Sequence, residues 1–235
     1  MKILITGATS GIGESLALLY AKEHQVYACG RNAEALQRLG EHESITPLCF
    51  DVTDLAQITA VTAEIDDLDL VVLNAGVCEY IDDARHFDSA LFERVIRGNL
   101  LSLGYCLEAL LSKIKSGGQL AIVSSSVTYL PITRSEAYGA AKAGATYLAR
   151  TLAVDLPDID VSVVHPGFVH TPLTAKNDFA MPMAISSEDA AKRIVRGLHK
   201  RQAEIHFPKR FTLILKALRA LPTSLWLRIA KGMVR

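Results

Sequence analysis

A tyrosine and a lysine stand four residues apart in Tyr138-Gly-Ala-Ala-Lys142, and the chemistry of this pair is the starting point. On a helix, residues four apart share one face, so the two side chains can influence each other. A free phenol has a pKa near about 10 and transfers protons poorly at neutral pH. A neighbouring ammonium favours the phenolate, so we expect Lys142 to lower the pKa of Tyr138 and make it a usable acid or base.

Three serines precede this pair, at the end of the apolar run over residues 120–123. The run predicts a buried strand, and reactive groups in α/β proteins gather where such strands end. The spacing to Tyr138 favours Ser125 as a partner, with Ser126 as the alternative. A Tyr/Lys pair alone is more often part of an ordinary helix face, so the rest of the chain has to support a catalytic interpretation.

A glycine-rich turn follows the first apolar strand, over residues 2–6, and leads into a helical pattern over about 12–22. Glycines allow a tight turn and let backbone N–H groups approach a pyrophosphate, which the N-terminus of a helix stabilises. The spacing is Gly7-x-x-x-Gly11-x-Gly13 rather than G-x-G-x-x-G, and a purely structural turn is the alternative. The strand–turn–helix context favours nucleotide binding.

The next strand, over residues 25–29, ends in Gly30-Arg31, where the charge bears on cofactor choice. An acidic residue here would bind the adenosine ribose and select NAD. A guanidinium suits a phosphate dianion, so Arg31 predicts NADP (NADPH) in preference to NAD. The alternative is a solvated arginine at a helix start, because Asn32 has the character of an N-cap.

Two further predicted strands end in residues that a cofactor can contact. Asp51 follows the strand over 45–50 and can accept a hydrogen bond from an adenine amino group. The alternative is that Asp51 or Asp54 caps the helix that follows. The strand over 68–73 runs into Asn74-Ala75-Gly76, which are small and polar where a cofactor would pass.

The second half of the domain repeats this pattern. Asn99 lies within a helical pattern over about 89–115, and because asparagine is a poor interior helix residue it predicts a bend or a bound water. The strand over 160–164 leads to Thr171, which can bind a cofactor amide or phosphate. Residues 173–187 form a polar loop suited to a mobile lid over a substrate.

Strands and helices alternate along the chain and end with a helix over 187–201 and a strand over 203–207. Near-continuously apolar strands in this order require a parallel sheet, of about seven strands, with helices on both faces. A chain of 235 residues, half of them hydrophobic, can bury one large core, so we expect a single α/β domain over 1–207.

Composition excludes several classes of function. Lys plus Arg and Asp plus Glu are 25 each, so bulk charge indicates no nucleic-acid partner. No apolar run reaches the roughly 20 residues that cross a bilayer, and the chain opens in a strand without a leader, so we expect a cytoplasmic protein. The four cysteines form no CxxC motif and the seven histidines are scattered, so we assign no metal.

The segment over 208–235 differs from the rest, because from Ile205 onward the chain has seven Lys or Arg and no acidic residue. Two helical pieces rich in Leu and Ile, over about 210–220 and 223–233, are separated by Pro222. Such a basic amphipathic extension can lie on anionic lipid. The favoured alternative is a tail packed on its own domain or on a partner subunit, with its basic residues in solvent.

Together these motifs resemble those of the short-chain dehydrogenase/reductase family, over residues 1–207. The resemblance implies a Rossmann-like doubly wound sheet and identifies Asn99, Ser125, Tyr138 and Lys142 as the catalytic set, although Thr128 stands where the family usually carries glycine. The residues predicted to bind the cofactor are Gly7, Thr9, Ser10, Gly11, Ile12, Gly13, Arg31, Asp51, Val52, Asn74, Ala75, Gly76, Tyr138, Lys142, Pro166, Gly167, Val169 and Thr171.

The resemblance also implies a mechanism, in which hydride passes between NADPH and a carbonyl carbon while Tyr138 protonates the oxygen. Lys142 would hold the nicotinamide ribose, Ser125 would orient the carbonyl oxygen, and Asn99 would hold a water. We therefore predict an NADP-dependent oxidoreductase acting on a small-molecule carbonyl or alcohol. The alternatives are a dinucleotide-binding regulatory protein with little turnover, and a membrane-surface protein acting through its basic tail.

Small residues on the helix over 136–155 indicate close packing between subunits. They are Ala140, Ala141, Gly144 and Ala145, and the helical pattern over 89–115 is similarly apolar. The family commonly assembles through such helices, so we expect a homodimer or homotetramer.

Overall fold

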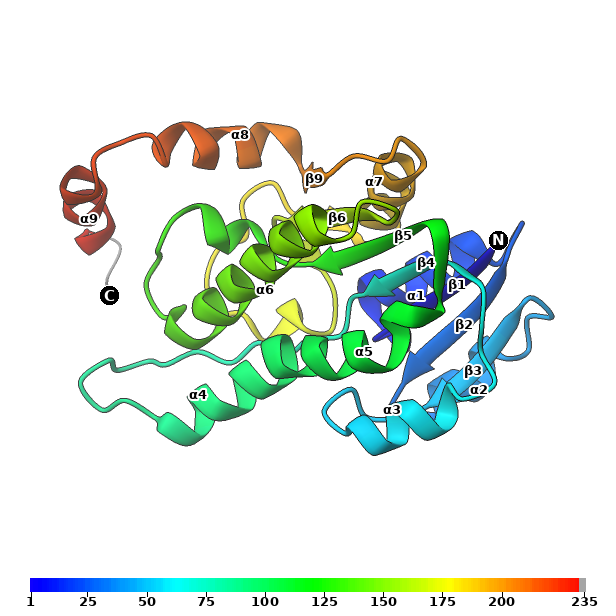
Figure 1. Cartoon of the computed structure of the whole chain (residues 1–235). Coiled ribbons are helices and arrows are strands. Elements are labelled where there is room, and N and C mark those ends of the chain that lie inside the picture. Colours follow the sequence, from blue (N-terminus) through cyan, green and yellow to red (C-terminus); the bar gives the residue numbers. More distant parts are fainter. Residues whose placement is uncertain (233–235) are drawn as a thin grey trace.

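The computed structural model describes residues 1–232 and shows a parallel sheet between two layers of helices (Figure 1). The strand order is β3-β2-β1-β4-β5-β6-β9. These strands are β1 (Lys2–Thr6), β2 (Gln25–Gly30), β3 (Ile45–Cys49), β4 (Leu68–Leu73), β5 (Ile114–Val123), β6 (Asp160–Pro166) and β9 (Glu204–Phe207). The predicted parallel sheet of about seven strands is confirmed.

Helices cover both faces of this sheet. One face is covered by α1 (Gly11–Tyr20), α2 (Ala33–Leu39) and α7 (Ser187–His199), and the other by α3 (Leu55–Val61), α4 (Ser89–Ile96), α5 (Ser102–Leu110) and α6 (Glu136–Asp155). On β1, Ile3 and Ile5 pack toward the first layer and Leu4 toward the second. Because successive strand residues face opposite sides, a sheet with helices packed on both faces requires strands that are apolar throughout.

The structure differs from the predicted elements in two places. The helical pattern predicted over 89–115 stops early, because β5 already begins at Ile114 and pairs irregularly with β4. Its middle widens into a π-helical turn at Arg97–Leu101, which contains Asn99. Two short strands, β7 (Val169–His170) and β8 (Ile185–Ser186), pair across the segment predicted as an open loop.

The tail forms two helices, α8 (Lys209–Leu218) and α9 (Thr223–Lys231), and residue 233 of the second predicted piece lies outside the described residues. Thr212 of α8 is fully buried beside β9, and its hydroxyl lies 2.6 Å from Nδ1 of His206. The buried indole of Trp226 on α9 donates to the Pro131 carbonyl oxygen at 2.9 Å. No helix within residues 1–232 is long and apolar enough to span a membrane.

The small residues of α6 pack mostly within the subunit. Ala141 and Ala145 are fully buried, and a Cβ added to Gly144 would lie 2.9 Å from Leu100 Cδ2. Ala140, by contrast, is exposed and Gly144 is half-buried, so only part of the predicted set is covered within the subunit. The large apolar side chains that α6 exposes are Tyr147 and Val154, and the expected homo-oligomer would have to cover these as well.

We expect the tail to loosen in acid because of His206. Burial, reinforced by the nearby ammonium groups of Lys209 and Lys216, lowers the pKa of His206 from 6.5 to about 4. Between these two values the unfolded chain binds a proton that the folded chain does not, so stability falls as the pH drops from 6.5 toward 4. The free energy of unfolding in urea should therefore fall by about 1 kcal/mol from this histidine between pH 7 and pH 5, because solvent screening reduces the full effect of the shift.

A substituted histidine separates this contribution from general acid sensitivity. His206→Gln should remove that part of the pH dependence, whereas His199→Gln, at an exposed position on α7, should retain it. Equal pH dependence in the wild type and in His206→Gln would contradict the prediction.

Candidate active site

The order of the strands reverses between β1 and β4, and in open α/β sheets such a switch point leaves a crevice at the carboxyl ends of the strands. A cavity of about 330 Å³ lies along this crevice, and a second of about 110 Å³ extends toward β5 and α6. We call them the outer and the inner chamber. They form one cleft, because their walls share the residues Ile12, Asn74, Gly76, Thr171 and Leu173.

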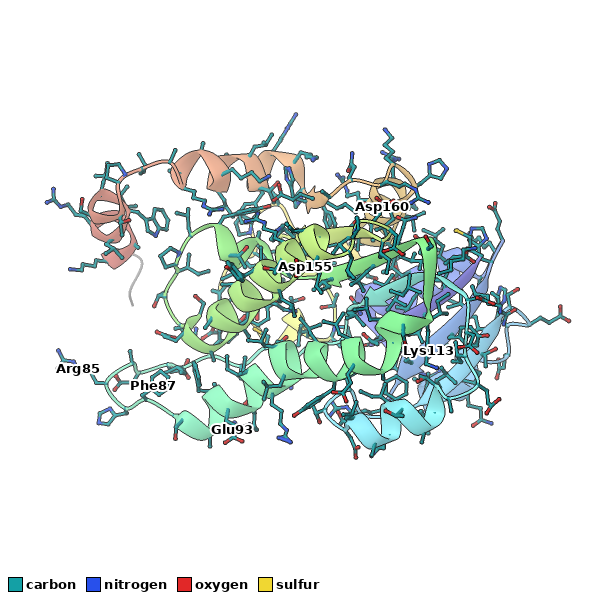
Figure 2. All side chains as sticks on the ribbon, viewed as in Figure 1. Arg85, Phe87, Glu93, Lys113, Asp155 and Asp160 are labelled. Atoms are coloured by element: carbon teal, nitrogen blue, oxygen red, sulfur yellow. The ribbon has the colours of Figure 1, made fainter. Side chains whose placement is uncertain are left out.

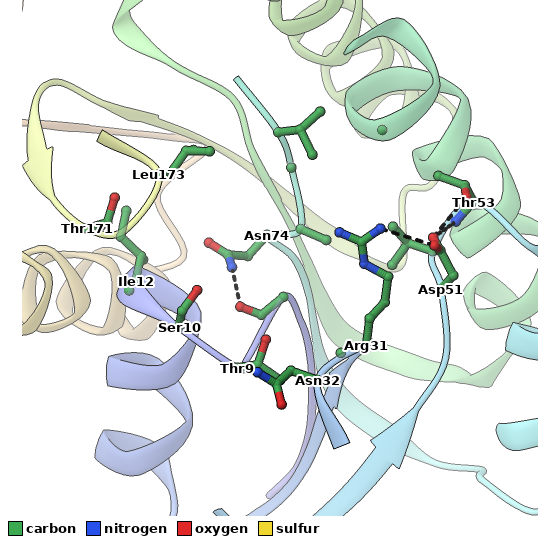
Figure 3. A pocket seen from close by; sticks show the side chains of 18 of the residues that line it. Thr9, Ser10, Ile12, Arg31, Asn32, Asp51, Thr53, Asn74, Thr171 and Leu173 are labelled. Atoms are coloured by element: carbon green, nitrogen blue, oxygen red, sulfur yellow. Dashed lines mark hydrogen bonds and ion pairs between the residues drawn. The ribbon is translucent and has the colours of Figure 1, made fainter. Parts of the chain in front are cut away.

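The turn between β1 and α1 forms one wall of the outer chamber (Figure 3). Gly7 has φ +66° and Gly11 φ +57°, backbone conformations that glycine adopts without strain. Asn74 clamps the turn from the other side, because its Nδ2 donates to the carbonyl oxygens of Thr6 at 3.1 Å and Gly7 at 3.3 Å. A Cβ on Gly7 would lie only 2.8 Å from Ala75 Cα. This side-chain-free cradle at a helix N-terminus fits a pyrophosphate.

Gly13 has a different place from the other predicted cofactor residues, all of which line one of the two chambers. It lies inside α1, where the helix crosses the turn. A Cβ here would overlap the Gly7 carbonyl oxygen and lie 2.6 Å from Asn74 Nδ2. Its hydrogen therefore lets α1 sit close on the turn, the packing role that the sequence indicates.

Arg31 and Asp51 form an ion pair in the outer chamber, with Nη1 3.3 Å from Oδ2 (Figure 3). Partial burial acts to raise the pKa of Asp51, but hydrogen bonds from Thr53 and the charge of Arg31 lower it overall. The cap of α3 is Asp54, whose carboxylate accepts from Gln57 N, so Asp51 does not serve as the cap. Asn32 caps α2 by accepting from Ala35 N.

The four predicted catalytic residues line the inner chamber together. Tyr138 and Lys142 lie one turn apart on α6, and Ser125 follows β5. Lys142 Nζ donates to the Val123 carbonyl oxygen at 2.9 Å and lies 5.7 Å from the centroid of the Tyr138 ring. Ser125 lines the chamber and Ser126 does not, which favours Ser125 of the two serines.

Burial determines the protonation of this pair. It raises the pKa of Tyr138, with a further contribution from Cys78, while a hydrogen bond with Ser125 acts in the opposite direction. It lowers the pKa of Lys142 to about 8. The expected lowering of the Tyr138 pKa is therefore not observed, because the ammonium is directed at Val123 and burial dominates. At neutral pH the phenol keeps its proton, and the amine is mostly charged.

Asn99 fixes the segment that follows β4. Its Nδ2 donates to the carbonyl oxygens of Val77 and Val95, both at 2.8 Å, and its Oδ1 accepts from Val77 N at 3.2 Å. A Cβ on Gly76 would lie 2.6 Å from this Oδ1 and 3.3 Å from Lys142 Nζ. Because both amide hydrogens are used, only Oδ1 retains capacity for the predicted water.

Sequence reasoning missed several residues of the cleft. His165 supports the serine loop, because its Nδ1 lies 3.0 Å from the Ser125 carbonyl oxygen, which can only accept. Burial lowers the pKa of His165, so the ring is neutral and donates from Nδ1. His165 itself lies behind the wall of the cleft, and the lining residues that were not predicted are Gly30, Asn32, Phe50, Thr53, Val77, Gly98, Val123, Ser124, Leu173 and Thr174. Most adjoin a predicted strand end, which is the signal that could have found them.

Three loops over residues 78–88, 130–135 and 173–184 extend beyond the carboxyl ends of β4, β5 and β6 (Figure 1). Arg134 connects them, because its guanidinium donates to Asp82 at 2.8 Å and to Asp178 at 2.7 Å. Arg85 and Phe87 project at the outer tip of the first loop (Figure 2). The segment predicted as a mobile lid is thus connected to the loop over 130–135 by the ion pair between Arg134 and Asp178.

The fold and the cleft define a dinucleotide-binding α/β protein, and comparisons with known proteins are more specific. A family model described as short chain dehydrogenase matches residues 1–182. The chain is 33% identical over 237 residues to an uncharacterised oxidoreductase from Myxococcus xanthus, covering 95% of this chain and 93% of that protein. It is 31% identical over 180 residues to an NADP-dependent 3-hydroxy acid dehydrogenase from Salmonella typhi, covering 72% and 73%.

Among solved structures, a short-chain dehydrogenase from Burkholderia cenocepacia in complex with NADP superposes with a TM-score of 0.86 over 97% of this chain and 96% of that one. At 22% identity this is a likeness of fold. The family match and the two relatives show that the chain belongs to the short-chain dehydrogenase/reductase family. It is an oxidoreductase that acts on CH–OH and C=O groups and binds a nicotinamide dinucleotide.

Proposed function

We propose that this oxidoreductase uses NADP and that Tyr138 is its general acid and base. The observation that carries the proposal is the single cleft, which joins the glycine cradle to a chamber lined by Ser125, Tyr138 and Lys142. A panel of carbonyl and alcohol compounds, followed by the absorbance of NADPH, tests it. Tight NADPH binding without turnover of any compound would favour the regulatory alternative.

Reduction of a carbonyl group adds a hydride to carbon and a proton to oxygen, and a bound nicotinamide supplies the hydride. Tyr138, protonated at neutral pH because burial raises its pKa, donates the proton to the oxygen. Ser125 donates a hydrogen bond to the same oxygen and stabilises the charge that develops there. In the reverse direction, Tyr138 accepts the proton of the alcohol.

The other residues of the cleft hold and orient. Lys142 keeps its ammonium beside Tyr138 and would contact the nicotinamide ribose, while Thr171 would bind the carboxamide or a phosphate. Asn99 fixes the backbone of Val77 and would hold a water through Oδ1. The glycine cradle would bind the pyrophosphate, and Asp51 the adenine.

Arg31 supports NADP as the cofactor, because its guanidinium lines the outer chamber and 69% of the side chain is exposed. A relative that is 31% identical is NADP-dependent. Arg31→Asp would replace the cation by a second carboxylate beside Asp51 and repel a 2′-phosphate. We expect the ratio of kcat/KM for NADPH to that for NADH to fall by about 10- to 100-fold, the range of a charge-assisted hydrogen bond.

Arg38→Asp provides the matched control, because Arg38 lies on α2, the helix that follows Arg31, where it pairs with Glu34 and does not line the cleft. It makes the same change of charge and should leave the cofactor ratio unchanged. An unaltered ratio in Arg31→Asp would mean that Arg31 does not read the 2′-phosphate.

A further inference from the structure

The surface of the tail combines exposed aliphatic side chains with cations that form no ion pair within residues 1–232. We propose that the two tail helices, α8 and α9, are an interfacial anchor that docks the protein on an anionic phospholipid bilayer. This reverses the preference from sequence for a tail that is simply packed on its own domain. The structure shows that the packing uses only part of each helix.

The domain covers the aliphatic side chains of the two tail helices only in part. The domain-facing side of α8 is occupied by Thr212 and Phe211, and that of α9 by Trp226. Five large aliphatic side chains of the two tail helices are from 42% to 54% exposed: Leu213, Ile214, Leu225, Leu227 and Ile229. Large aliphatic side chains exposed in this number on two successive helices indicate a docking surface.

Four of the six cations on the two tail helices and the loop between them are available to a ligand. Lys216 is paired with Glu204, and Lys209 contacts His206. Within residues 1–232, Arg210, Arg219, Arg228 and Lys231 form no ion pair. The chain as a whole has no net charge, yet this segment has no acidic residue, so the positive charge is concentrated where the aliphatic side chains are exposed.

The positive charge of the two tail helices determines which kind of partner can bind them. A second copy of the chain docked through the same two helices would bring these cations against an identical set, and the tail has no acidic side chain to neutralise them. An anionic bilayer neutralises them and takes up the aliphatic side chains in its interfacial region. The helices have 10 and 9 residues, so they can lie on a bilayer but cannot cross it.

The tail helix α9 also contacts the domain near the cleft. Trp226 is bonded to Pro131, in the loop that precedes α6, which carries Tyr138. Figure 1 shows α9 at the same end of the molecule as the carboxyl end of β5. A docked bilayer would therefore lie beside the loops that surround the inner chamber.

Flotation of the full-length protein with vesicles tests the proposal. Vesicles of phosphatidylcholine with 30 mol% phosphatidylglycerol should carry the protein upward in 0.1 M NaCl, and vesicles of phosphatidylcholine alone should carry at least about tenfold less. Binding should fall in 0.5 M NaCl. Leu213→Ser/Ile214→Ser and Arg210→Gln/Arg219→Gln/Arg228→Gln/Lys231→Gln should each reduce the bound fraction at least about tenfold.

Matched variants elsewhere on the surface control for general changes in polarity and charge. Leu18→Ser/Val154→Ser removes two exposed aliphatic side chains, and Lys22→Gln/Arg193→Gln/Arg196→Gln/Lys200→Gln removes four exposed cations. Both should float like the wild type.

Absence of flotation, equal flotation with neutral vesicles, or equal loss in the control variants would overturn the proposal. The proposal would also be overturned if the variants of the two tail helices changed the sedimentation coefficient of the free protein and left flotation intact, because the face would then bind a second copy. Turnover of a water-soluble carbonyl should persist in every variant, which keeps this test separate from that of the enzyme.

Discussion

Tyr138→Phe should reduce kcat by about three orders of magnitude, within the range of general acid–base catalysis, and leave NADPH affinity within about threefold of the wild type. Phenylalanine keeps the ring and removes only the hydroxyl, so the walls of the inner chamber stay in place. Burial raises the pKa of this phenol, so its proton is present at neutral pH and available to a carbonyl oxygen. Steady-state kinetics together with titration of NADPH binding would measure the two effects separately.

Tyr147→Phe is the control for this experiment, because Tyr147 lies on the same helix and 77% of its surface is exposed. It should turn over substrate like the wild type. If Tyr138→Phe kept more than about a tenth of wild-type kcat, the proton would come from another group, and the proposed mechanism would fail.

Gly13→Ala should disrupt the cofactor cradle itself. The added Cβ would meet the backbone carbonyl oxygen of Gly7 and the side-chain amide of Asn74, which is held in place by its hydrogen bonds to Thr6 and Gly7. Overpacking of this kind costs about 3 kcal/mol, and here it would also displace α1 from the turn. We expect that loss in the free energy of unfolding in urea and at least about a tenfold loss of NADPH affinity.

Gly104→Ala isolates the steric effect from the chemistry of a Gly-to-Ala change. Gly104 lies on the exposed side of α5, and nothing stands within 4 Å of an added Cβ. Since alanine is the better helix former, this variant should be as stable as the wild type or more stable by up to about 1 kcal/mol. A Gly13→Ala protein that unfolds and binds NADPH like Gly104→Ala would show that α1 can shift without consequence.

The parts of the fold that follow from local pattern were predictable. A strand such as β1 must be apolar on both sides because helices cover both faces, and that requirement is visible in the residues themselves. Asn99 indicated an irregular place in its helix because asparagine is disfavoured in a helix interior, although the π-helical turn itself was not predicted. The predicted cofactor residues, Gly13 excepted, line the cleft because parallel strands bring their carboxyl ends to one edge.

What depends on distant contacts was not predictable. The pKa of Tyr138 is set by the surroundings of the chamber rather than by Lys142 four residues away, so spacing indicated the wrong direction. Arg134 joins Asp82 and Asp178 from separate loops, and no local pattern pairs them. The periodicity of α8 and α9 showed that they are amphipathic, but only their seating revealed that Leu213 and Ile214 face outward.

The contact between α9 and the domain also contains a natural spectroscopic probe. The chain has a single tryptophan, and its indole is 4% exposed and bonded to the Pro131 carbonyl oxygen. Intrinsic fluorescence excited at the indole band therefore arises from one place in the molecule, the junction of the last helix with the domain. Its emission maximum should shift to the red when that helix lifts from its seat, without a label and independently of any reaction.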